Sequence, residues 1–156
     1  MMPGVGPHMM DASSRRPWIR AVIFAGVVYF VVGFGSAALD PSVSDRARFM
    51  WRLAAWVVSA AVYAAHIGYE HFRLGSSPRA TALHAALAVA VGAFLLAVAA
   101  TVHAGTVPSH APYRRYLLAL VVWPLVTAVP ASLVALALAA VLARLPTRRL
   151  AELLNK

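Results

Sequence analysis

Long apolar segments joined by short polar ones dominate the chain. Four such segments cover about residues 18–39, 49–73, 79–103 and 113–143. A helix needs about 20 apolar residues to cross a hydrocarbon core about 30 Å thick, and each segment reaches that length. The pattern predicts an all-α, polytopic membrane protein with four transmembrane helices. Because the connections are short, we expect neighbouring helices to run antiparallel in an up-down bundle.

The two ends of the chain differ from this central domain of residues 18–143. Residues 1–17 are polar, contain Pro and Gly and show no periodicity, which predicts a disordered leader. Residues 144–156 alternate leucines with basic residues. That pattern predicts a short amphipathic tail, with the leucines toward lipid and the basic side chains toward the headgroups.

Capping residues and prolines mark helix ends and a bend. Ser44 is a good N-cap for the second helix, and Ser77 followed by Pro78 suits the start of the third. Pro124 and Pro130 lie inside the fourth segment. Membrane helices tolerate proline, so we expect a kink there rather than an end.

Small residues recur along one side of the first and second helices. Such rows let helix backbones approach closely in lipid, where apolar packing alone does not drive association. We therefore expect both rows to lie at helix–helix contacts. The first row is Gly26, Tyr29, Gly33 and Ser36, and the second is Ala60, Ala64 and Gly68.

The distribution of charge indicates a bilayer rather than a nucleic acid as the partner. Only 12% of the residues are charged and 62% are hydrophobic, although the net charge is +9. The basic residues form no single face or run, so we exclude nucleic-acid binding. They cluster at the ends of the apolar segments, as the positive-inside bias places them.

Counting Lys and Arg by side predicts the orientation. The N-terminus, the second connection and the C-terminus carry nine basic residues, whereas the first and third connections carry five. We therefore expect both termini in the cytoplasm. Arg far outnumbers Lys and Ala is abundant, which favours a bacterial protein and hence the bacterial cytoplasmic membrane. The chain has no cysteine, which excludes disulfides and thiolate metal sites.

One polar stripe runs along the second segment, within Trp51–Arg73. Its members recur in alternating steps of four and three, which places them on one side of a helix. The other apolar segments are mostly Ala, Val and Leu, so this stripe holds most of the chemistry in the chain. It comprises Arg52, Trp56, Ser59, Tyr63, His66, Glu70 and Arg73.

Two histidines are expected at the same depth. His66 and His84 each lie nine residues from Gly75, the centre of the connection between the second and third segments. At about 1.5 Å rise per residue, both fall at a similar level on the cytoplasmic side. Intramembrane ionisable residues often mark function. The predicted intramembrane polar cluster is Ser59, Tyr63, His66, Glu70, His84 and Ser132.

Four interpretations of this cluster remain open. His66, Glu70 and His84 offer two imidazoles and a carboxylate, which suit zinc or non-haem iron. The two histidines also suit a bis-histidine haem. Alternatively, His66 and Glu70 could carry protons or a small solute, because histidine titrates near neutrality. In the fourth interpretation Glu70 belongs to an exposed rim, paired with Arg73, and His66 only joins helices.

No catalytic, phosphate-binding or dinucleotide-binding motif occurs, which lowers the expectation of an enzyme. We assign no cofactor. The leading hypothesis is a small integral protein that acts as an interaction or accessory component, with other membrane proteins or a second copy as partners. The alternatives are a proton-coupled or small-solute transporter and a metal- or haem-dependent redox protein.

Overall fold

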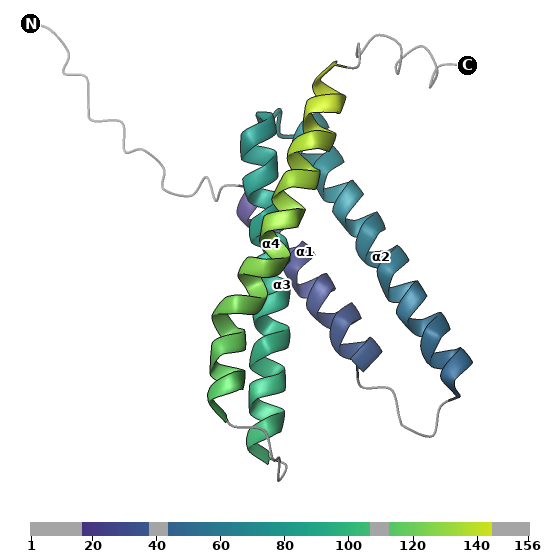
Figure 1. Cartoon of the computed structure of the whole chain (residues 1–156). Coiled ribbons are helices and arrows are strands. Elements are labelled where there is room, and N and C mark those ends of the chain that lie inside the picture. Colours follow the sequence, from purple (N-terminus) through teal and green to yellow (C-terminus); the bar gives the residue numbers. More distant parts are fainter. Residues whose placement is uncertain (1–16, 38–43, 107–112, 145–156) are drawn as a thin grey trace, which may run out of the picture.

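The computed structural model describes residues 17–37, 44–106 and 113–144. These residues form four α-helices (Figure 1), all long and apolar enough to cross a membrane. The prediction of an all-α fold with four membrane-length helices is confirmed. The predicted leader before Pro17 and the amphipathic tail after Arg144 lie outside the described residues. The helices are α1 (Pro17–Ala37), α2 (Asp45–Phe72), α3 (Pro78–Thr106) and α4 (Tyr113–Arg144).

Both predicted caps are confirmed. The hydroxyl of Ser44 accepts a hydrogen bond from the backbone N–H of Ala47 at 3.3 Å, so α2 begins about one turn earlier than its apolar pattern suggests. Ser77 accepts from the N–H of Ala80, also at 3.3 Å, and Pro78 is the first residue of α3. Proline suits that position because its φ is already helical and its missing N–H would have no partner there.

A tight turn brings the start of α3 back beside the end of α2. Gly75 takes a φ of +60°, a left-handed conformation that glycine adopts without a Cβ clash. The backbone N–H of Ser76 then donates to the carbonyl of Glu70 at 3.0 Å. The turn therefore fixes the last residues of α2 against the first turn of α3.

Helix α3 packs against α4 and α1, and small residues make this close packing possible. Ala85 and Ala88 on α3 and Ala135 on α4 are fully buried. Built at Gly92, a Cβ would lie 2.7 Å from the Cβ of Tyr29. At Gly26 it would lie 2.7 Å from a methyl carbon of Val91. The expectation that the glycines of the first row lie at a helix contact is confirmed.

Helix α2 is held mainly near one end. Its buried residues among those described are His66, Ile67 and Glu70, all in its last two turns. Ile67 packs with Ala82, Ala85 and Ala135. Toward Asp45, α2 stands away from α4 (Figure 1).

The small-residue row of α2 does not lie at a tight helix contact, so that expectation was wrong. Ala60 and Ala64 are exposed, and a Cβ built at Gly68 would meet only Phe72 of its own helix. The physical reason is the separation of α2 from α4, which leaves the middle of this row without a neighbouring helix.

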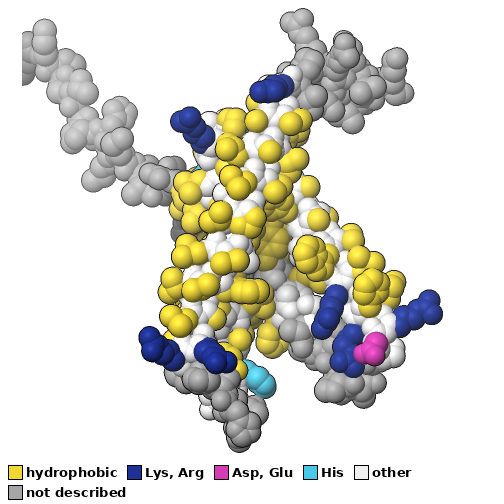
Figure 2. Space-filling view, in the orientation of Figure 1, with side chains coloured by type: hydrophobic (Ala, Val, Ile, Leu, Met, Phe, Trp, Pro, Cys, Tyr) yellow, Lys and Arg dark blue, Asp and Glu magenta, His cyan; other side chains and the backbone are white. Residues whose placement is uncertain are grey.

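Helix α4 continues through both of its prolines, and it changes direction along its length, as predicted (Figure 1). Thr127 lies between the prolines and donates to the carbonyl of Trp123 at 2.9 Å. Its hydroxyl is thus satisfied within the helix. Across the molecule, apolar side chains cover the middle of the helices and basic side chains gather at their ends (Figure 2).

Candidate functional site

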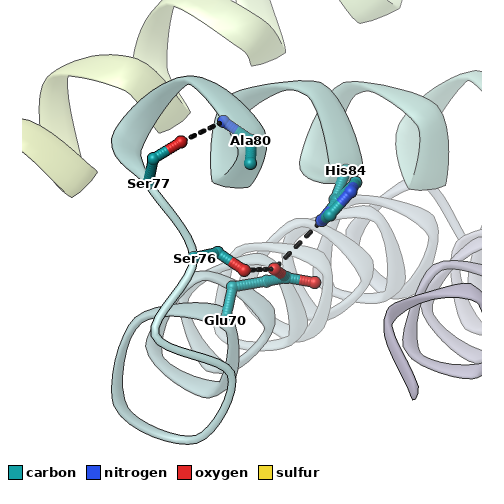
Figure 3. A network of polar contacts seen from close by, with 5 residues as sticks. All are labelled: Glu70, Ser76, Ser77, Ala80 and His84. Atoms are coloured by element: carbon teal, nitrogen blue, oxygen red, sulfur yellow. Dashed lines mark hydrogen bonds and ion pairs between the residues drawn. The ribbon is translucent and has the colours of Figure 1, made fainter. Parts of the chain in front are cut away.

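A buried carboxylate joins α2 to α3. Glu70 lies in the last turn of α2 and its side chain is fully buried. The hydroxyl of Ser76 donates to its Oε2 at 2.6 Å, and Nδ1 of His84 on α3 lies 3.0 Å from the same oxygen (Figure 3). Two donors from the turn and from α3 thus converge on one oxygen atom.

This arrangement offsets the cost of burying a carboxylate. A charged group away from water costs several kcal/mol unless partners compensate it. Hydrogen bonds to ionised acceptors are about twice as strong as bonds between neutral groups. When the imidazole is protonated, the contact with His84 is an ion pair. When it is neutral, an Nδ1–H still donates to Glu70.

An aromatic ring from α1 completes the surroundings of His84. The indole of Trp18 stacks on the imidazole, with ring centroids 4.4 Å apart and planes within 2° of parallel. Stacking fixes the plane of the imidazole, and a protonated ring would gain a cation–π attraction as well. Three helices therefore meet at the Glu70 network, which we define as Trp18, Glu70, Ser76 and His84.

Two buried polar atoms next to this network lack hydrogen bonds in the described part of the chain. They are Oε1 of Glu70 and Nε2 of His66. His66 lines a hollow of about 500 Å³ between α1 and α2, together with Arg20 and Tyr69. Buried polar atoms in proteins nearly always have partners. His66, which lines this mostly apolar hollow, therefore has a ring nitrogen without a hydrogen-bond partner among the described residues.

The structure does not bring all the residues of the predicted cluster together at one place. Glu70 and His84 meet, whereas His66 lies on the hollow between α1 and α2. Tyr63 donates its hydroxyl to the carbonyl of Ala131 on α4. Ser132 donates to the carbonyl of Val129 in its own helix at 2.7 Å, and Ser59 lines a separate cleft.

The contacts of Glu70 correct one of the interpretations drawn from the sequence. Glu70 is not part of an exposed rim paired with Arg73, because it is buried and bonds to Ser76 and His84. Within residues 17–37, 44–106 and 113–144, no group of three His, Cys, Asp or Glu side chains is arranged to hold a metal ion.

Trp18 and Ser76 were missed as members of the network. Trp18 follows an arginine pair at the edge of an apolar segment, where tryptophan is expected at the membrane interface. Ser76 looked like an ordinary turn residue. A serine beside a glycine, six residues after a membrane carboxylate, was the available indication of its role.

A larger cleft lies where α2 separates from α4. Its volume is about 760 Å³ and residues from all four helices line it. In Figure 2 the surface recedes between the α3–α4 pair and α2. The lining is mostly apolar, with Tyr29, Ser36, Ser59, Tyr63 and Thr127 as polar members and Arg52 as the charged one. The residues of α2 and α4 that line the cleft are Arg52, Ala55, Trp56, Ser59, Ala60, Tyr63, Trp123, Val126, Thr127, Pro130 and Ala131.

The polar stripe predicted on α2 therefore divides among separate places, with His66 on the hollow between α1 and α2. Arg52, Trp56, Ser59 and Tyr63 line the cleft, whereas Glu70 belongs to the buried network. The first half of α2 thus lines the open, mostly apolar cleft, whereas its last turn belongs to the buried Glu70 network. Comparison with known proteins gave no matching family model, curated protein or solved structure.

Replacing Glu70 should destabilise the fold. Glu70→Ala removes the acceptor of both hydrogen bonds, and we expect the free energy of unfolding to fall by about 1.5–3 kcal/mol, the range for hydrogen bonds to charged groups. Glu70→Gln keeps a carbonyl oxygen for Ser76 and should lose less. The midpoint of unfolding by SDS in mixed micelles measures both effects.

Asp45→Ala is the matched control. Asp45 is the exposed carboxylate in the first turn of the same helix, 3.7 Å from Arg48, so its removal should leave the midpoint unchanged. An unchanged midpoint for Glu70→Ala would contradict the view that this carboxylate holds α2 in place.

Proposed function

We propose that the protein is a small multi-pass protein of a bacterial cytoplasmic membrane and acts there as an interaction component. In this proposal it holds an apolar chain of a membrane molecule between α2 and α4. The supporting observation is the cleft of about 760 Å³. Small-molecule pockets measure about 300–1,000 Å³ and are predominantly apolar with few polar groups, as this cleft is.

The shape of the cleft favours a chain over a whole helix as its occupant. Along α2 the lining extends from Arg52 to Tyr63. At 1.5 Å per residue this is about 16 Å, roughly half the thickness of a hydrocarbon core. An acyl or isoprenoid chain from one leaflet matches that length, whereas a transmembrane helix about 10 Å wide and twice as long does not.

In the proposed topology the four helices cross the bilayer in alternating directions, with both termini in the cytoplasm. The excess of basic residues at the termini and the α2–α3 connection supports the cytoplasmic position of both termini. The contacts among Trp18, Glu70 and His84 support the alternating directions, because these residues come from the start of α1, the end of α2 and the start of α3.

A reporter fused after Lys156 tests this orientation. Alkaline phosphatase folds only outside the cytoplasm and should be inactive in the fusion, whereas a fluorescent protein that folds in the cytoplasm should be bright. A control fusion between residues 107 and 112 should give the opposite pattern. An active phosphatase after Lys156 would contradict the proposed orientation.

Filling the cleft should remove bound lipid. In mild detergent, we expect the protein to bind added phosphatidylethanolamine, with native mass spectrometry counting the lipids retained. Ala60→Phe places a ring in the cleft and should lower occupancy about tenfold or more. The neighbouring Ala61→Phe makes the same change on an exposed residue outside the lining and should leave occupancy unchanged.

Other outcomes identify other occupants. If Ala60→Phe dissociates a dimer without changing lipid binding, the cleft holds a second copy of the chain. If it releases a co-purified membrane protein, the cleft holds that partner. Equal lipid occupancy in the Ala60 and Ala61 variants contradicts lipid binding in the cleft.

Two unpartnered atoms favour proton transfer as a second candidate function. Oε1 of Glu70 and Nε2 of His66 are buried without a hydrogen bond within the described residues, and His66 lines a hollow together with Arg20 and Tyr69. Carboxylates and histidines form proton relays in membrane transporters. In this candidate function Glu70 and His66 would pass protons, whereas in the first candidate Glu70 only holds α2 against α3.

Proton flux into liposomes distinguishes the two candidates. If Glu70 and His66 carry protons, Glu70→Gln and His66→Ala should abolish flux reported by an internal pH-sensitive dye. His103→Ala, an exposed histidine near the end of α3, should leave the flux unchanged. No flux above that of empty liposomes, or equal flux in all variants, would contradict this second candidate.

A further inference from the structure

We infer that the cleft selects a phospholipid with a net negative headgroup, and that Arg52 binds that headgroup. This inference rests on the proposed function, because it names the class of molecule held between α2 and α4. It is carried by the charge of the lining and by the position of Arg52 at one end of it.

Arg52 supplies the charge of the lining. None of the lining residues is Asp or Glu, and Arg52 is the basic one. Its guanidinium has no hydrogen bond or ion pair within the described residues. The nearest carboxylate on the helix, Asp45, lies 3.7 Å from Arg48 instead. Arg52 thus presents a cation for which the described residues provide no counter-ion.

The position of Arg52 matches the end of a lipid rather than its middle. On α2 it is the lining residue closest to the start of the helix, and the apolar lining continues from it through Ala55, Trp56 and Ala60. A headgroup at Arg52 therefore leaves the attached chain to follow α2 toward Tyr63 and Pro130. Guanidinium binds phosphate oxygens through two parallel N–H donors, so the geometry of the group suits this headgroup.

The other basic residues at this end of the molecule lie outside the lining of the cleft. Arg46 and Arg48 lie in the first turn of α2, and Arg114 and Arg115 begin α4. Basic side chains gather at the lower ends of both helices in Figure 2. A zwitterionic headgroup gains little net attraction from the guanidinium of Arg52, whereas a net negative headgroup pairs with it. In the proposed topology this end of the cleft faces the outer leaflet.

Lipid titrations with matched chains test the inference. Phosphatidylglycerol and phosphatidylethanolamine with identical acyl chains are added separately to the protein in detergent, and native mass spectrometry gives the affinity of each. The wild type should prefer phosphatidylglycerol about fivefold or more. Arg52→Gln should abolish the preference by weakening phosphatidylglycerol binding, with phosphatidylethanolamine binding almost unchanged.

Arg46→Gln is the matched control, because Arg46 is exposed on the same helix and outside the lining. It should keep most of the preference. If Arg52→Gln keeps the preference while Ala60→Phe abolishes binding of both lipids, the inference about Arg52 fails and the lipid-binding function stands. If Ala60→Phe changes the binding of neither lipid, both fail.

Discussion

The buried carboxylate of Glu70 sets the position of α2, and the rest of the structure depends on it. In lipid, apolar side chains gain little by packing against each other, because the surrounding chains are equally apolar. Ile67 and its alanine neighbours therefore hold α2 only weakly. A carboxylate is different, since exposing it to hydrocarbon is costly. The contacts with Ser76 and His84 keep the end of α2 against α3, and Trp18 brings α1 to the same point.

The cleft follows from holding a helix at one end. The remaining pairs, α1 with α3 and α3 with α4, are closed by glycines and alanines that let backbones touch. Helix α2 has its buried side chains only between His66 and Glu70, so nothing draws its first half onto α4. The hydroxyl of Tyr63 donates to the carbonyl of Ala131 and so joins α2 to α4 beside the cleft. Arg52 and Trp56 then line the cleft instead of packing against α4, and we propose that a lipid occupies that space.

Local patterns predicted the elements, and long-range geometry accounts for what they missed. Apolar length predicted four helices, and serine and proline positions predicted the starts of α2 and α3. Glycine spacing predicted that α1 makes a close helix contact, and the structure shows that its partner is α3. Equal distances from Gly75 correctly directed attention to the region of His84. They could not reveal that its partner is Glu70 rather than His66, because that depends on how the two helices rotate about their axes. The cleft also escaped prediction, since the same small-residue spacing occurs on α2 and on α1 while only α1 is closely packed.

For insertion into a bilayer, the order in which groups emerge during synthesis matters as much as the final packing. Glu70 and His84 are only 14 positions apart in the sequence, and Ser76 lies in the turn between them. Closing so short a loop costs little entropy. The hairpin of α2 and α3 can thus enter the membrane with its carboxylate already partnered, before any of α4 has been made. A protein that placed the partner of Glu70 on its last helix would have to carry an unpaired acid through the translocation machinery.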